Sequence, residues 1–222
     1  MKPICTSISR AICSLLLCWC CLTANGQTQQ KDTTALFQGL SVSADLVGFL
    51  QRQLGSYGQY EAALHVNLRD KYFPVVELGL GEADADDIAT QLKYKTHAPY
   101  GRLGCDFNIL KNKHDHYRAY AGFRYGFTSF KYDLESPGLN DPVWKEHVPF
   151  GAEGVKCYQH WIEGVFTIDA YIWGPLRMGW SARYKRRVAH DHNGIGKPWY
   201  IPGYGTDGNT RLGGSFNITL EI

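Results

Sequence analysis

Apolar and polar residues alternate along most of this sequence, as expected of β-strands, whose side chains point to opposite faces with a period of two. In the final segment, Leu212, Phe216 and Ile218 fall on one face, and Arg211 and Asn217 fall on the other. Seven earlier segments show the same pattern: 40–50, 59–68, 71–81, 100–110, 117–130, 161–172 and 176–186. The sequence therefore predicts an all-β fold of eight antiparallel strands.

The polar faces of these segments carry charges of both signs, which suit either a solvated outer surface or an ion-paired interior. The candidates for an interior charge network are Glu61, Glu77, Arg102, Asp106, Arg118, Arg124, Glu163, Arg177, Arg183 and Arg211. Eight strands enclose a lumen just wide enough for side chains. We expect Glu61 or Glu77 to pair with Arg102 or Arg124, and such pairs favour a packed plug over a water-filled channel.

The connections between the segments are of two kinds, which we expect to lie at opposite ends of the barrel. The first hairpin, at 52–56, is the one short connection at the long-loop end. This asymmetry is typical of an up-and-down transmembrane barrel of the outer membrane, with short periplasmic turns and long external loops. The other connections are short at 69–71, 111–116 and 173–175, and long at 82–97, 131–156 and 188–208.

A soluble barrel of the lipocalin type is the competing interpretation, with apolar residues inside and charges outside. Two groups of residues argue against it. Aromatic residues lie on the apolar faces, several near strand ends where membrane interfaces would be: Tyr60, Tyr72, Tyr117, Phe127, Trp180 and Tyr184. Glycines lie on the polar faces, where a narrow interior filled by long charged side chains needs room: Gly104, Gly122, Gly126, Gly179 and Gly213.

The chain ends on the last residue of a predicted strand, Ile222. In a closed barrel the last strand pairs with the first, and lipid covers its apolar face. An apolar terminal residue in the lipid-facing register also resembles the C-terminal signal read by the barrel-insertion machinery, in which the usual residue is aromatic.

The N-terminus has the form of an export signal, because Lys2 and Arg10 precede an apolar run at 11–22 and small residues follow. The run is short for a membrane-spanning helix. Lipid attachment is the other alternative, but Leu17 before Cys18 is a poor substitute for the small residue that it needs. We expect a signal peptide at 1–26, a short periplasmic segment at 27–38 and an outer-membrane barrel at 39–222, in a Gram-negative cell.

Removal of the signal leaves 21 basic residues against 21 acidic ones. The mature chain is therefore formally neutral, and nucleic acid is not an expected partner. It keeps two of the seven cysteines, Cys105 and Cys157. A predicted strand lies between them, so the lateral gap alone is about 9.5 Å, whereas a disulfide needs Cα atoms within roughly 7 Å. We expect two free thiols.

Six stretches of the sequence are distinctive: YFPVVELGLG at 72–81, FRYGFTSF at 123–130, HWIEG at 160–164, GWSARYKRR at 179–187, GKPWYIPGYG at 196–205 and the C-terminal GGSFNI. They resemble an uncharacterised domain-of-unknown-function family of Bacteroides-type small outer-membrane β-barrels. The resemblance covers about 36–222 and implies an outer-membrane location and a porin-like fold akin to the transmembrane barrel of outer membrane protein A. It implies no catalytic residue.

Metal binding and catalysis are weaker interpretations. The two His-Asp-His tripeptides, at 114–116 and 190–192, fall on connections at opposite ends of the barrel and cannot form one site. The acidic residues of 82–87 lack the spacing of a calcium loop. His160 and Glu163 could suggest an enzyme that acts on lipid at the rim, but alternation places them on opposite faces of one strand. We expect no metal, no cofactor and no catalytic residue.

The expected role is therefore structural or interactive, for a monomer of the cell outer membrane whose long loops contact lipopolysaccharide, a surface ligand or a protein partner. The expected loop contacts are Trp144, Trp199, Tyr200 and Tyr204, because aromatic anchors contribute much of the binding energy of interfaces; packing of the loops over the barrel mouth is the alternative role for them. A lipid-modifying enzyme of the barrel rim is the second hypothesis, and a soluble carrier is the third.

Overall fold

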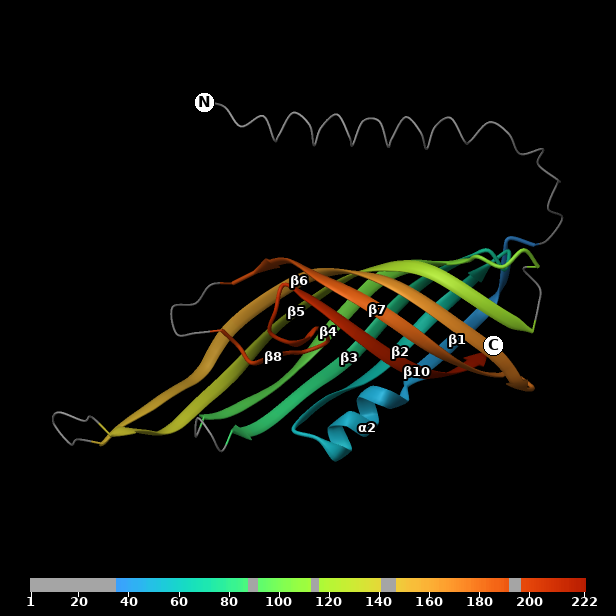
Figure 1. Ribbon diagram of the computed structural model, residues 1–222. Helices are drawn as coiled ribbons and strands as arrows, with labels where there is room; N and C mark the ends of the chain where they lie inside the picture. Colours follow the sequence, from blue (N-terminus) through green and yellow to red (C-terminus); the bar gives the residue numbers. More distant parts are fainter. Residues whose placement is uncertain (1–34, 88–91, 113–115, 141–146, 192–196) are drawn as a thin grey trace, which may run out of the picture. The chain divides into compact units, whose positions relative to one another are not determined.

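A closed barrel of eight antiparallel strands makes up the described part of the chain (Figure 1). The computed structural model describes residues 35–87, 92–112, 116–140, 147–191 and 197–222. The order of strands around the ring is β1-β10-β7-β6-β5-β4-β3-β2, so each strand pairs with its neighbour in the chain and the last pairs with the first. The prediction of an all-β, up-and-down fold is confirmed. The expected signal peptide at 1–26 lies outside the described residues.

The strands of the barrel lengthen from the first to the sixth. They are β1 (Phe37–Asp45), β2 (Tyr57–Leu68), β3 (Tyr72–Asp87), β4 (Leu92–Asn108), β5 (Tyr117–Asn140), β6 (His147–Trp173), β7 (Leu176–His190) and β10 (Thr210–Glu221). A helix, α2 (Leu46–Leu54), follows β1, and a two-stranded sheet of β8 (Tyr200–Ile201) and β9 (Gly205–Thr206) follows β7. Among the described residues no helix is long and apolar enough to cross a bilayer.

The two ends of the chain close the barrel. Ser41 of β1 pairs with Glu221 of β10, and Asp45 pairs with Asn217. Ile222 extends the ladder, because its amide donates to the carbonyl of Leu40 at 2.7 Å and its carbonyl accepts from the amide of Leu40 at 3.1 Å. The expected pairing of the final strand with the first is therefore confirmed.

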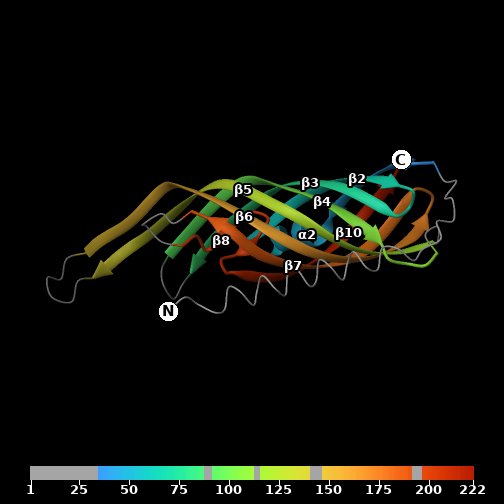
Figure 2. The same cartoon turned by 90° about the horizontal axis from the view of Figure 1, so that it is seen from above.

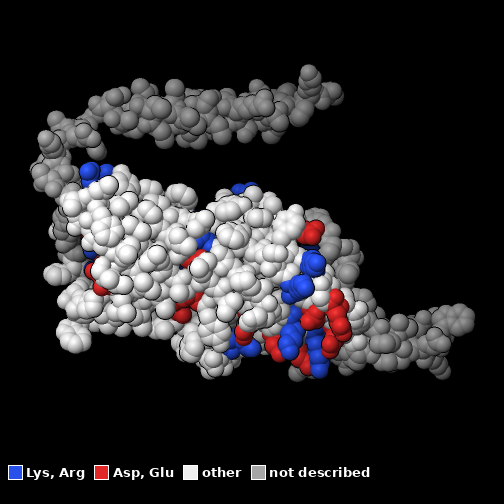
Figure 3. All heavy atoms as spheres, turned by 180° about the vertical axis from the view of Figure 1, so that it is seen from behind, with Lys and Arg blue, Asp and Glu red and all other residues white. Residues whose placement is uncertain are grey.

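The barrel is apolar outside and charged inside. Leu78, Trp180 and Leu212 point outward and are 63%, 65% and 83% exposed, whereas Glu77 and Arg102 point inward and are each 1% exposed. Figure 3 shows one side of the outer surface, with most of the visible charged side chains gathered at the end where β5 and β6 extend furthest (Figure 2) and only a few elsewhere. Strand alternation separates the two kinds of side chain, since each strand presents its apolar register to the outside and its charged register to the lumen.

Two of the predicted long loops are mostly strand. β3 and β4 remain paired as far as Asp87 and Leu92, and β5 and β6 as far as Asn140 and His147, so the loops expected at 82–97 and 131–156 are extended hairpins. Opposite charges face each other across these extensions, which stabilises the pairing. Lys93 and Lys95 of β4 lie opposite acidic residues on both sides: Asp84 and Asp86 of β3, and Asp133 and Glu135 of β5.

The first strand is shorter than predicted, because α2 replaces the expected strand at 46–50 and the expected short hairpin at 52–56. The side chain of Asp45 ends β1 and begins the helix, since it accepts hydrogen bonds from the amides of Val47 at 3.0 Å and Gly48 at 3.2 Å. Such an N-cap satisfies amides that otherwise have no partner in the first turn. An acidic residue before an apolar run was the sequence signal of this helix.

Gly126 leaves space for the indole ring of Trp161 between β5 and β6. A methyl group at Gly126 would overlap the indole of Trp161, which is fully buried and cannot move aside. Gly164 faces outward, and a methyl group there would have no atom within 4 Å. We expect Gly126→Ala to lower the free energy of unfolding by about 1–3 kcal/mol, the usual cost of overpacking, and Gly164→Ala to leave it nearly unchanged. Urea unfolding in detergent micelles, followed by tryptophan fluorescence, measures both, and equal midpoints would contradict the packing described.

Candidate functional site

The centre of the barrel is filled by an ion-paired network around Glu77. Its carboxylate accepts hydrogen bonds from Arg102 at 2.8 Å, from Arg124 at 2.9 Å and from Arg183 at 2.7 Å. These arginines come from β4, β5 and β7, so the network connects the wall of β3 with strands across the lumen. A single carboxylate thus holds three cations in the middle of the barrel.

Arg102 connects Glu77 with two further carboxylates. Its Nη1 lies 2.6 Å from Glu61, and its Nε lies 2.9 Å from Glu163. Both carboxylates also accept from aromatic donors: Tyr100 donates its hydroxyl to Glu61 at 2.5 Å, and Trp161 donates its indole N–H to Glu163 at 2.6 Å. The guanidinium side chain is fully buried, so the three carboxylates replace its hydration.

The network continues toward the short-turn end of the barrel. Arg124 forms a bidentate pair with Asp106, with both N–O distances at 2.7 Å. A separate group follows: Arg118 pairs with Glu221, and Arg177 pairs with Asp169 at 2.7 Å. The predicted interior charges therefore lie inside the barrel in two groups, and every carboxylate of the prediction has an arginine partner.

Arg211 differs from the prediction. Its Nε donates to the carbonyl of Thr206 at 2.8 Å, and its Nη2 donates to the carbonyl of Asp207. It forms no ion pair with a carboxylate among the described residues. The reason is its place at the start of β10, where the segment before that strand turns into the barrel and offers backbone carbonyls instead of side chains.

The segment 199–208, predicted as part of an external loop, folds into the barrel above the network. Ile201 and Pro202 are fully buried. The carbonyl of Gly203 accepts a hydrogen bond from Arg102 and another from Lys185, each at 2.7 Å. Gly203 has a φ of 77°, a conformation that glycine adopts without strain. We call this segment the inner loop.

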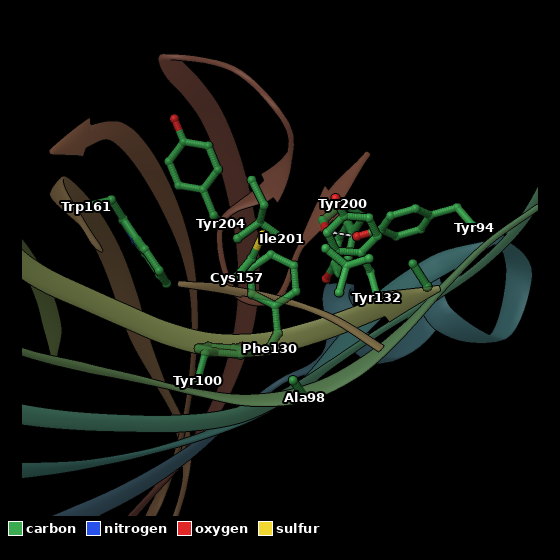
Figure 4. Packing of buried hydrophobic residues seen from close by; sticks show 12 residues of the cluster. Tyr94, Ala98, Tyr100, Phe130, Tyr132, Cys157, Trp161, Tyr200, Ile201 and Tyr204 are labelled. Carbon is green, nitrogen blue, oxygen red and sulfur yellow. Dashed lines mark hydrogen bonds between the residues drawn. The ribbon is translucent and has the colours of Figure 1, made fainter. Parts of the chain in front are cut away.

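Aromatic side chains from the wall pack around the inner loop, as Figure 4 shows. The hydroxyl of Tyr94 donates to the carbonyl of Tyr200 at 2.6 Å, and the hydroxyl of Tyr200 donates to the carbonyl of Gly58 at 3.0 Å. Burial raises the pKa of the Tyr200 hydroxyl above its ordinary value, so it stays a protonated donor at neutral pH. The cluster includes Tyr94, Tyr100, Phe130, Tyr132, Trp161, Tyr200, Ile201 and Tyr204.

The residues expected as external loop contacts differ in where they lie. Tyr200 and Tyr204 are 2% and 1% exposed, so their assignment as external contacts is wrong and the alternative, packing over the barrel mouth, is correct for them. They turn inward because the hydrogen bonds of Gly203 draw the inner loop into the lumen. Trp199 is 41% exposed and packs edge-on against Tyr57 at 5.5 Å between ring centroids. Trp144 lies outside the described residues.

The structure separates the residues considered for catalysis or metal binding. His160 contacts Tyr125 on the outer face, with Nδ1 2.9 Å from the hydroxyl, while Glu163 is buried inside, as alternation predicts. Cys105 and Cys157 are both free thiols, which confirms that prediction. The described residues include no group of three His, Cys, Asp or Glu placed to hold a metal ion. The tripeptides at 114–116 and 190–192 fall partly outside the described residues.

Below the central network the lumen keeps a small cavity of about 50 Å³. It is lined by Glu77, Asp106, Arg118 and their neighbours, and its volume suits one or two water molecules. The interior therefore has no room for a substrate at this level. Sequence reasoning missed Lys185 and the inner loop as parts of the site, although Lys185 falls in the inward register of its strand.

Removing Arg102 should destabilise the barrel, because Glu61, Glu77 and Glu163 would be left facing one another in a buried site. We expect Arg102→Met to lower the free energy of unfolding by about 3–5 kcal/mol, the usual cost of leaving a buried charge unpaired. The control is Lys93→Met, which removes an exposed pair with Asp86 at 3.6 Å and should change stability by less than about 1 kcal/mol. Urea unfolding of both variants tests this, and a comparable loss in each would contradict it.

Comparison with known proteins assigns the chain to a family of unknown function. No curated protein and no solved structure matches the chain. A family model described as a domain of unknown function, DUF6048, matches residues 7–222. Because that match covers nearly the whole sequence, this chain belongs to the DUF6048 family.

Proposed function

We propose that this chain is an outer-membrane β-barrel with a structural or surface-interaction role, closed inside by its ion pairs and inner loop. The observation that supports this most is the inverted polarity of the wall. Leu78, Phe123 and Trp180 are each more than half exposed, whereas Arg102, Arg124 and Glu163 are each no more than 2% exposed. Hydrocarbon is the surrounding that suits such a surface, and a closed barrel satisfies its backbone groups within the wall.

The filled lumen supports a role other than conduction. The central arginines and carboxylates connect opposite walls, and the inner loop covers them from the long-hairpin end. An open channel through the barrel would require these charges to separate, at the cost of several kcal/mol for each buried ion. Binding at the outer surface is therefore the better supported activity.

The extended hairpins supply that surface. Beyond the uncharged belt, the outer faces of β3, β4 and β5 carry exposed charges of both signs, including Asp84, Asp86, Lys93, Lys95 and Glu135. Figure 3 shows charged side chains concentrated at this end. Such a surface suits polar partners outside the bilayer, of which lipopolysaccharide and a protein partner are the candidates.

A substitution to arginine on the apolar outer face distinguishes this proposal from a soluble carrier. Leu78 is 63% exposed in the middle of β3, and an arginine near the bilayer midplane costs about 2–4 kcal/mol. We expect Leu78→Arg to reduce the amount of protein that remains in membranes after an alkaline carbonate wash. Leu92→Arg, at the end of the β3–β4 hairpin, is the control and should be retained like the unmodified protein. Full retention of Leu78→Arg, or release of the unmodified protein by carbonate, would contradict membrane insertion.

The filled lumen also predicts that the protein does not conduct ions across a bilayer. We expect the purified protein, reconstituted in a planar bilayer at neutral pH, to give no stepwise ion conductance, because paired charges and the inner loop occupy the channel axis. A reconstituted open porin serves as the positive control. Reproducible conductance steps from the unmodified protein would show that the network opens, and would contradict a closed barrel.

A further inference from the structure

The barrel wall has an opening between β2 and β10. Because β1 ends at Asp45, it pairs with β10 only between Asn217 and Glu221. The first half of β10, residues 210–216, therefore pairs with β7 alone. On the other side of the opening, residues 57–61 of β2 pair with β3 alone. Two strand edges thus face each other without a strand between them.

Helix α2 lies in this opening, contacts both strands and packs more closely against β2 than against β10. Gly48 lies so close to β2 that a methyl group on it would be 2.6 Å from Cγ of Gln59, and Gly58 of β2 has a similarly close contact with Arg52. Arg52 also pairs with Glu82 of β3 at 2.8 Å, which holds the helix on that side. Figure 1 shows α2 directly after β1, beside the start of β2.

The packing is looser on the β10 side of the opening. Gly213 falls in the inward register of its strand and is nevertheless exposed. A methyl group on Gly213 would have one neighbour within 4 Å, Cε of Lys185 at 3.7 Å, and one on Gly214 would have only the carbonyl of Ser181. Unpaired strand edges are unfavourable in hydrocarbon unless water or a ligand meets their polar groups.

A groove of about 640 Å³ fills this opening and leads from the outer surface into the lumen. Its outer part is apolar, lined by Val47, Leu50 and Leu54 of α2 and by Leu212 of β10. Its inner part is lined by Gln59, Lys185, Arg211 and the inner loop. The volume falls within the range of small-molecule sites, roughly 300–1,000 Å³. The groove therefore changes from apolar to basic along its length.

The two cations of the groove differ from those of the central network. Lys185 donates to the carbonyls of Gly203 at 2.7 Å and Tyr204 at 3.3 Å, and Arg211 donates to the carbonyls of Thr206 and Asp207. Neither forms an ion pair with a carboxylate among the described residues, and no acidic residue lines the groove. Arg211 is partly exposed and lies opposite the buried Lys185, so an anionic group that enters from the apolar side meets positive charge there.

We propose that this opening is a lateral binding site for a long-chain fatty acid, with the acyl chain between α2 and β10 and the carboxylate at Arg211 and Lys185. The apolar outer part suits one hydrocarbon chain, and the basic inner part suits one anionic head group. This inference rests on the proposed membrane insertion, because the opening then faces the bilayer, from which the fatty acid enters.

Native mass spectrometry of the detergent-solubilised full protein tests the site, with oleate and uncharged monoolein as probes that share an acyl chain. We expect one oleate to bind per chain, more tightly than monoolein. Arg211→Gln should weaken oleate binding about tenfold, as expected for loss of a charged hydrogen bond, and leave monoolein binding unchanged. Gly213→Leu should abolish binding of both, because the side chain fills the groove. Lys71→Gln, at an exposed position in the short turn between β2 and β3, is the control and should bind both as the unmodified protein does.

The outcomes separate the two proposals. Equal binding of oleate and monoolein, or unaltered oleate binding by Gly213→Leu, would overturn the lateral site. If this happens while the protein resists carbonate extraction, the membrane proposal stands and only the lateral site fails. If carbonate releases the protein from membranes, both fail. Heat-dependent migration of each variant on a denaturing gel shows whether its barrel is folded, and the Arg211→Gln variant keeps the test valid if Gly213→Leu does not fold.

Discussion

The buried ion pairs around Glu77 are the constraint on which the rest of this barrel depends. Arg102, Arg124 and Arg183 contact one carboxylate from three strands, so the strands must hold their registers for these contacts to form. A shift of one residue along any of these strands would turn its charges outward and its apolar side chains inward. The network therefore specifies both the register of the wall and the polarity of its two faces.

The same network determines where the inner loop lies. Arg102 has more hydrogen-bonding capacity than its carboxylates use, and it donates to the carbonyl of Gly203. Lys185 donates to that carbonyl as well. The tyrosines of the surrounding wall then bury the loop and supply hydroxyl donors to its backbone and to β2. A polar interior thus carries an aromatic layer on top of it, and together they fill the lumen.

The wall is complete except where α2 interrupts β1. Asp45 ends the strand by capping the helix, and the short strand leaves half of β10 without a second neighbour. The cap at Asp45 therefore produces the opening. Its exposed strand edge, its apolar helix face and the access to its cations all follow from the early end of β1. A binding role for the opening fits a protein whose central lumen has space for little more than water.

Alternation along the strands was enough to predict the eight-stranded all-β fold and the outward apolar face, because period-two patterning is a local property. It placed Glu61, Glu77, Arg102 and Arg124 inside but left open which carboxylate pairs with which arginine. The free state of Cys105 and Cys157 followed from the same strand order. The helix at 46–54 had a local signal, Asp45 before an apolar run, which the alternation at 40–50 obscured. The extended hairpins and the inward turn of Tyr200 and Tyr204 depended on tertiary contacts. Cross-strand charges and the carbonyl of Gly203 decided them, and these partners meet only when distant segments come together in the closed barrel.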